Sequence, residues 1–278
     1  MKSLKLKTPS YRYIEQSFKE WLDILGYAPF TVYSMPLYIR EMLHYLESNG
    51  ITQIKDINNK EIRKYYQQLK FRPNTRWQGG LSNNYLNKHQ QGIKKFSDYL
   101  RQAGRLILPV INLKAEETDT QEIIILTTEE IQQLYKAAEQ SRAVFYREEL
   151  TIRDKAMLSI FYSCGLRRTE GISLDISDIL FDKGLIYVRK GKNYKERYTP
   201  INKANLQTLQ EYIYDSRPRF LKNNKEEALF ISQRGKRVNG HTILLRLKQL
   251  QQKTNDPILQ EKIIGLHTLR HSIATHLL

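Results

Sequence analysis

Three short segments, far apart in the chain, carry arginine, lysine and histidine in patterns suited to holding a phosphate. In the first, Arg167 follows Gly165, which ends an apolar helical stretch. An arginine at such a point can direct two parallel N–H groups at a bound anion. Glu170 is placed to orient this region. By itself the pattern is weak, because an arginine near a helix end is most often simply solvated.

The second segment is a basic turn between two predicted strands, Leu185–Val188 and Arg197–Ile201. Lys192 lies on this turn, where a flexible ammonium group can reach into a groove and donate a proton. Lys190 or Lys195 could take its place. An ordinary basic hairpin tip is the plainer interpretation when this segment is considered alone.

The third segment places His267, Arg270 and His271 at positions i, i+3 and i+4, so a helix presents all three on one face. Arginine neutralises the non-bridging oxygens of a phosphate, and histidine moves a proton near neutral pH. The combination favours phosphoryl transfer, although a single histidine here would more often be a core residue.

Together the three segments resemble the conserved motifs of the tyrosine recombinases, the integrase and Xer-type family. The segment Gly165–Glu170 is similar to the family's first box, Gly191–Arg197 to its lysine-bearing hairpin, and His267–Leu278 to its second box. Their order and spacing also agree. Residues 13–105 resemble the family's helical core-binding domain in pattern. The resemblance therefore covers nearly the whole chain.

The resemblance implies a mechanism in which a tyrosine attacks phosphorus and forms a 3′-phosphotyrosyl link. This link conserves bond energy, so neither a cofactor nor ATP nor a metal is required. Two arginines would clamp the scissile phosphate, a lysine would protonate the leaving 5′-hydroxyl, and a histidine would serve as acid, base and phosphate ligand. The matching positions are Arg167, Arg270, Lys192 and His267, with Glu170 and His271 in support.

The sequence departs from the family pattern in two places. In the family another motif, ending in His or Trp, and then the tyrosine follow the second box, whereas this chain ends at Leu278. The 18 tyrosines lie upstream of the second box and match no nucleophile motif. We therefore expect a truncated chain that is inactive for cleavage. The alternatives are a non-catalytic DNA-binding remnant and, more distantly, a type IB topoisomerase. In the hairpin, Asn193 and Tyr194 replace the usual Gly-Asn.

The charge is consistent with a DNA partner. The formal net charge is +16, and residues 1–114 hold 19 Lys+Arg against 8 Asp+Glu. Such a surplus indicates a polyanionic partner, although a basic surface can also serve solubility alone. A predicted helix at about residues 83–103, together with Arg105 just beyond it, carries a basic stripe that either contacts phosphates or is merely solvated. The stripe consists of Lys88, Lys94, Lys95, Arg101 and Arg105.

The elements that position these residues are mainly helical, with a small β-hairpin. We predict a helical core-binding (SAM-like) domain over residues 1–114, a linker over 115–122 and a mixed α/β catalytic domain over 123–278, incomplete at its carboxy terminus. The spacing of apolar residues predicts the helices, Ile123–Leu126 is a strand candidate, and Thr127 with Glu130 forms a capping box. The resemblance implies that the two domains form a C-shaped clamp on DNA.

Several further expectations concern partners and location. The resemblance implies a double-stranded recombination site as partner, a homotetramer on DNA and a monomer when free. The sequence contains neither a signal peptide nor a stretch long enough to span a membrane. The single cysteine, Cys164, excludes an intrachain disulfide, and the six histidines are too scattered for a metal site. We expect a cytoplasmic, nucleoid-associated protein of bacterial or mobile-element type.

Overall fold

The computed structural model describes residues 4–74, 78–104, 113–118, 122–140, 147–189, 196–222 and 225–278. The chain divides into two compact units, Met1–Thr120 and Gln121–Leu278, each with its own hydrophobic core. The described part is mainly helical and includes one small antiparallel sheet, as the predicted fold class requires. No described helix has both the length and the apolar composition that a membrane span needs.

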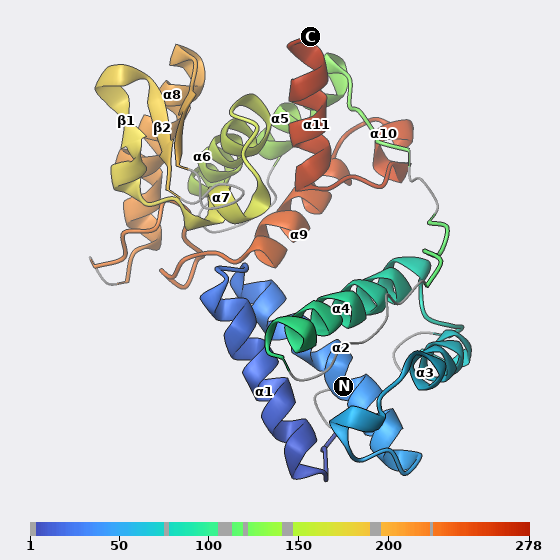
Figure 1. Cartoon of the computed structure of the whole chain (residues 1–278). Helices are drawn as coiled ribbons and strands as arrows, with labels where there is room; N and C mark the ends of the chain where they lie inside the picture. The colour runs from blue at the N-terminus through green and yellow to red at the C-terminus, as the bar shows by residue number, and fades with distance from the viewer. Residues whose placement is uncertain are drawn as a thin grey trace. The chain divides into compact units, whose positions relative to one another are not determined.

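The described residues of the first unit form four long helices (Figure 1). Phe18, Ile39 and Phe96 come from three of these helices and are almost completely buried, which confirms the apolar periodicity of the sequence. Side-chain caps begin two helices, since Asn58 accepts from backbone N–H groups at the start of α3 and Ser82 does so for α4. The helices are α1 (Pro9–Ile24), α2 (Pro29–Ser48), α3 (Asn59–Phe71) and α4 (Asn83–Gln102).

Residues 113–118, at the end of the first unit, are hydrogen bonded along α3 and α4. The side chain of Asn87 donates to the carbonyl oxygen of Glu116 (2.9 Å) and accepts from its N–H (2.8 Å). Gln90 donates to the carbonyl oxygen of Lys114 (2.9 Å), and Tyr66 donates to the Glu116 carboxylate (2.9 Å). The beginning of the predicted linker is therefore attached to the first unit.

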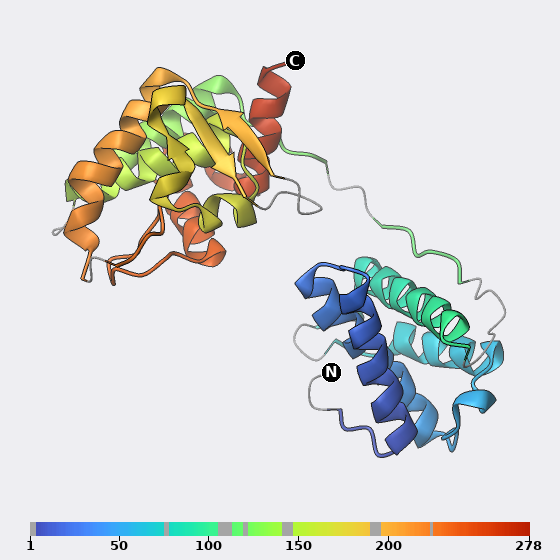
Figure 2. The same cartoon turned by 60° about the vertical axis from the view of Figure 1, so that its left-hand side comes forward.

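In the second unit, helices pack around a hydrophobic core. The unit also contains a three-stranded sheet in the order β1-β2-β3. Figure 2 shows the strands side by side. The helices are α5 (Thr128–Glu139), α6 (Arg147–Leu158), α7 (Arg168–Ser173), α8 (Lys203–Glu211), α9 (Gly240–Gln251), α10 (Pro257–Glu261) and α11 (Leu266–His276). The strands are β1 (Ile179–Leu180), β2 (Leu185–Val188) and β3 (Arg197–Pro200).

Two predicted features of the second unit can be compared directly with the structure. The capping box is confirmed, because Thr127 Oγ1 accepts from the N–H of Glu130 and the Glu130 carboxylate accepts from the N–H of Thr127. The strand prediction for Ile123–Leu126 is wrong. This segment pairs with no strand among the described residues, and the N–H of Leu126 instead donates to Ser272 Oγ of α11 at 2.9 Å.

Candidate functional site

Arg167 lies at a sharp turn between α6 and α7. A π-helical segment, Ser159–Ser163, extends α6, and Gly165 then reverses the chain with a φ of +57°, a conformation that favours glycine. A Cβ atom at Gly165 would lie 3.2 Å from Ile273 Cγ2 of α11. The glycine therefore allows α11 to approach the turn that ends at Arg167.

Glu170 holds Arg167 through both its backbone and its side chain. One carboxylate oxygen accepts from the backbone N–H of Arg167, and the other accepts from Arg167 Nη1, both at 2.8 Å. The same carboxylate accepts two hydrogen bonds from the Arg197 guanidinium of β3, at 3.0 and 2.8 Å. Glu170 therefore connects the turn before α7 to β3, the second strand of the β2–β3 hairpin.

The charges around Glu170 determine its protonation. The Glu170 side chain is almost completely buried, and burial by itself raises the pKa of a carboxyl group. The hydrogen bonds from Arg197 and Arg167 outweigh burial and hold the pKa of Glu170 at about 2. The carboxylate is thus ionised at neutral pH and acts as an acceptor for both guanidinium groups.

Arg270 and His267 reach the same neighbourhood from α11. Arg270 Nη1 donates to the carbonyl oxygen of Gly165, two residues before Arg167. Desolvation lowers the pKa of Arg270, and so does the positive charge of Arg167. Desolvation also lowers the pKa of His267, and the charges of His271, Arg168, Arg270 and Arg167 add to this effect. Segments more than 90 residues apart in sequence thus meet in one cationic cluster.

The structure brings together most of the residues singled out from the sequence. Arg167, Glu170, Arg270 and His267 share this cluster, and His271 lies one helical turn from His267, exposed on α11. Lys192 and the rest of the predicted turn, residues 190–195, lie outside the described residues. No group of His, Cys, Asp or Glu side chains suited to a metal ion occurs in the described ranges.

Sequence reasoning missed a second group of ion pairs beside this cluster. Arg189, which follows β2, donates from Nε to Asp178 (2.8 Å) and from Nη1 to Asp175 (2.7 Å). Arg237 also donates to Asp175. The antiparallel register of β2 and β3 pairs Val188 with Arg197, which places Arg189 near Arg197. The only available sequence signal was the basic character of both hairpin arms.

The basic stripe of the first unit lies on the polar side of α4. Lys88 and Lys94 are exposed and form no ion pair with any described residue. Lys95 lies over the Tyr27 ring, 5.7 Å from its centroid, and 3.7 Å from an Asp98 oxygen. Arg101 is 3.6 Å from the other Asp98 oxygen. Arg105 lies outside the described residues. Asp98 therefore offsets part of the positive charge of this face.

Comparison with known proteins gives a consistent result for the whole chain. The profile of the phage integrase family matches residues 125–278. The chain is 31% identical over 270 residues to tyrosine recombinase XerD of Oceanobacillus iheyensis, covering 96% of this chain and 84% of that protein. It is 28% identical over 277 residues to tyrosine recombinase XerC 2 of Ralstonia nicotianae, covering 96% and 74% of the two chains.

Solved structures share the fold at low sequence identity. The Tn1549 transposon integrase in complex with transposon right-end DNA aligns with a TM-score of 0.67 at 17% identity, covering 95% of this chain and 86% of that one. The XerH site-specific recombinase in its post-cleavage complex with a palindromic difH substrate aligns with a TM-score of 0.65 at 18% identity, covering 96% and 73%.

Proposed function

We propose that this chain, which belongs to the phage integrase family and is a tyrosine-type site-specific recombinase, binds the phosphate to be cut between Arg167 and Arg270. One observation carries the proposal. The two arginines are 103 residues apart in sequence, yet Arg270 Nη1 donates to the carbonyl oxygen of Gly165, in the turn that leads to Arg167. Desolvation lowers the pKa of the neighbouring His267, and the charges of both arginines add to this effect. A cluster of like charges is costly unless an anion completes it.

In the proposed reaction the two arginines neutralise the non-bridging oxygens of the scissile phosphate. A tyrosine oxygen attacks phosphorus, the bond to the 5′-oxygen breaks, and a 3′-phosphotyrosyl link forms. His267 accepts the proton that the tyrosine hydroxyl loses, and Lys192 gives its proton to the leaving 5′-oxygen. Removing one such electrostatic donor typically lowers the rate by about 10²–10³-fold. Because one phosphoester replaces another, the step requires no energy source.

For residues 1–278 taken alone, we propose DNA binding without strand cleavage. Tyr162 precedes Arg167 by five positions, and its hydroxyl is hydrogen bonded to His276 Nδ1 at 2.9 Å. Burial also raises the pKa of Tyr162, which makes its phenolate harder to form. Tyr187 and Tyr198 of the hairpin instead pack against each other, with ring centroids 5.2 Å apart. The raised pKa of Tyr162 supports a nucleophile other than this tyrosine.

The proposed partner is duplex DNA that both units contact, with a homotetramer formed on the recombination site and a monomer when free. The exposed Lys88 and Lys94 of α4 support phosphate contacts by the first unit. Joining two weak binding modules raises the effective concentration of the second contact. We therefore expect each unit, expressed separately, to bind the site more weakly than the joined chain.

The proposal can be tested with a duplex site selected from a random pool by the protein itself. Two readouts are combined: covalent protein–DNA adducts on a suicide substrate, and strand scission by added hydrogen peroxide, a small nucleophile that can replace a tyrosine. We expect no adduct with residues 1–278, but scission by peroxide at one phosphate. Arg167→Ala or Arg270→Ala should abolish most of this scission.

Arg219→Ala is the matched control, because the Arg219 side chain is 71% exposed and its ion pair with Glu149 is long, with 3.9 Å between Nε and the carboxylate oxygen. This variant should cleave like the parent. Equal scission by the Arg167→Ala variant would contradict the phosphate site. An adduct mapped to a tyrosine within residues 1–278 would contradict the proposal of binding without cleavage.

A further inference from the structure

Both arms of the β2–β3 hairpin end at an arginine that is ion-paired to a buried carboxylate. On one arm Arg189 follows β2, and on the other Arg197 begins β3. Their partners all belong to the short segment from Glu170 to Asp178, which begins three residues after Arg167. The hairpin is therefore attached at both arms to the segment that also positions a phosphate-binding arginine.

The attachment of Arg189 uses the full fork of its guanidinium group. Nε donates to Asp178 at 2.8 Å, Nη1 donates to Asp175 at 2.7 Å, and Nη2 donates to Ser177 Oγ at 3.3 Å. Asp178 also accepts from the backbone N–H of Asp175 at 2.9 Å. Asp178 is 2% exposed and Asp175 8%. A lysine could not satisfy these acceptors, because its ammonium group lacks a planar fork.

A second arginine fixes Asp175 from the other side. Arg237 donates to Asp175, and its Nη1 donates to the carbonyl oxygens of Ile172 and Leu174, each at 3.0 Å. Leu174 in turn accepts from the N–H of Leu229 at 2.9 Å. Asp175 is therefore a fixed anchor, since it is connected to a backbone that is itself hydrogen bonded to the body of the unit.

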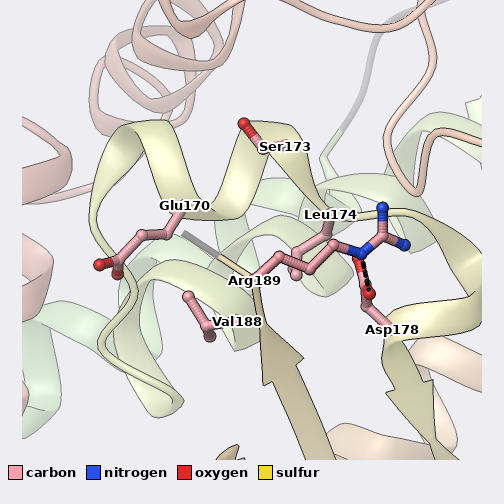
Figure 3. Close-up of a pocket in the computed structure, with 6 residues that line it drawn as sticks. All are labelled: Glu170, Ser173, Leu174, Asp178, Val188 and Arg189. Atoms are coloured by element: carbon pink, nitrogen blue, oxygen red, sulfur yellow. Dashed lines mark hydrogen bonds and ion pairs between the residues drawn. The ribbon is translucent and has the colours of Figure 1, made fainter. Parts of the chain in front are cut away.

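Val188, the last residue of β2, is packed in the core of the unit, and the ion pairs of Arg189 add a second attachment beside a cavity. A cavity of about 240 Å³ lies between α7 and the end of β2 (Figure 3). In Figure 3 the Arg189 side chain extends across the cavity to Asp178, while Glu170 lies at the other end. The cavity is lined by Glu170, Ser173, Leu174, Asp178, Val188 and Arg189.

We propose that Arg189, held by Asp175 and Asp178 and supported by Arg237, is a positioning residue that fixes the hairpin base from which Lys192 acts. Only residues 190–195 separate Arg189 from Glu196 and Arg197, so described residues on both sides of this predicted turn are held by ion pairs. Displacement of one end by about 1 Å can lower a rate by roughly 10²-fold. This inference rests on the proposed proton donation by Lys192.

The test uses two DNA substrates in the peroxide scission assay. One carries the normal phosphodiester, and the other carries sulfur in place of the leaving 5′-oxygen. A thiolate leaves without a proton, so the second substrate does not need Lys192. Arg189→Gln should slow scission of the normal substrate by roughly 10–100-fold and leave the sulfur substrate unchanged. Arg189→Lys should recover only part of the loss, and Arg219→Gln should have no effect.

The double variant Arg189→Gln/Lys192→Ala separates positioning from stability. If Arg189 acts through Lys192, the double variant should cleave at the rate of Lys192→Ala alone. Additive losses, or equal slowing of both substrates by Arg189→Gln, would overturn the positioning role. The proposed function of Lys192 fails separately, if Lys192→Ala slows the sulfur substrate as much as the normal one. Thermal unfolding of Arg189→Gln verifies that the variant is folded.

Discussion

Replacement of Glu170 by glutamine is the sharpest test of the cationic cluster. The change keeps the size of the side chain and removes its negative charge. In the parent, this carboxylate accepts three hydrogen bonds from the guanidinium groups of Arg167 and Arg197, at 2.8 to 3.0 Å. The variant leaves two neighbouring cations without their shared acceptor, and Arg167 loses the group that orients it.

The expected loss of stability follows from burial. Breaking a fully buried ion pair by removing one partner costs about 3–5 kcal/mol. The Arg167 and Arg197 side chains are 34% and 35% exposed to solvent, so water replaces part of the lost interaction. We therefore expect about 2–3 kcal/mol, which corresponds to roughly 5–10 °C in Tm for a unit of this size.

The pH dependence of stability provides an independent signature. The pKa of Glu170 is about 2 in the folded protein, below the ordinary value of 4.5. The folded state therefore favours the ionised form, and this stabilisation is present above pH 4.5 and is lost as the pH falls from 4.5 towards 2. The Glu170→Gln variant should lack this part of the acid dependence.

The assay is urea unfolding at several pH values, combined with peroxide scission of a bound DNA site. We expect Glu170→Gln to lower both the stability and the scission rate. Glu139→Gln is the control, since Glu139 pairs with Lys155 at 2.8 Å but is 59% exposed, and it should change stability by less than about 1 kcal/mol. Parent-like stability and scission in Glu170→Gln would refute the reasoning.

Three further outcomes are expected. Lys94→Ala combined with Arg101→Ala should weaken duplex binding and reduce the slope of log K against log salt by about 1–2, since each lost phosphate contact contributes about 0.9; an unchanged slope would show that this face does not contact DNA. In NMR titrations, added phosphate should raise the pKa of His267, which is below its ordinary value in the free protein, because a bound anion favours the imidazolium; an unmoved pKa would contradict an anion site there. Asn87→Ala combined with Gln90→Ala should speed hydrogen exchange of residues 113–118 without unfolding the first unit, and parent-like protection would show that these amides do not hold the segment.

The sequence predicted the local elements well, because each follows from neighbouring residues. The apolar spacing of Phe18 and Leu22 in α1, and the capping box before α5, depend on positions within a few residues of one another. The sheet was predicted less completely. β1 has only two residues, Ile179 and Leu180, and its pairing with β2 comes from the tertiary fold. Such a short strand leaves no period to detect.

The contacts of the site were harder to predict, because they join residues that are distant in sequence. Arg197 and Glu170 are 27 positions apart, and their pairing depends on the β2–β3 register and on the direction of the turn at Gly165. The role of Arg189 also depends on this register. On α4 the stripe looked uniformly basic, yet Asp98 lies close to both Lys95 and Arg101. Sequence reasoning identified the charged groups but not their partners.

The charge balance of the cluster is itself an argument for a phosphate ligand. Arg167, Arg197 and Arg270 bring three positive charges, and Glu170 brings one negative charge. The remaining two positive charges repel each other. Desolvation lowers the pKa of His267, and the charges of Arg270 and Arg167 add to this effect, so protonating His267 in the free protein is unfavourable. A phosphodiester brings one negative charge, and its pentavalent transition state brings two. The cluster is therefore more nearly neutralised by the transition state than by the substrate, which is the condition for electrostatic catalysis.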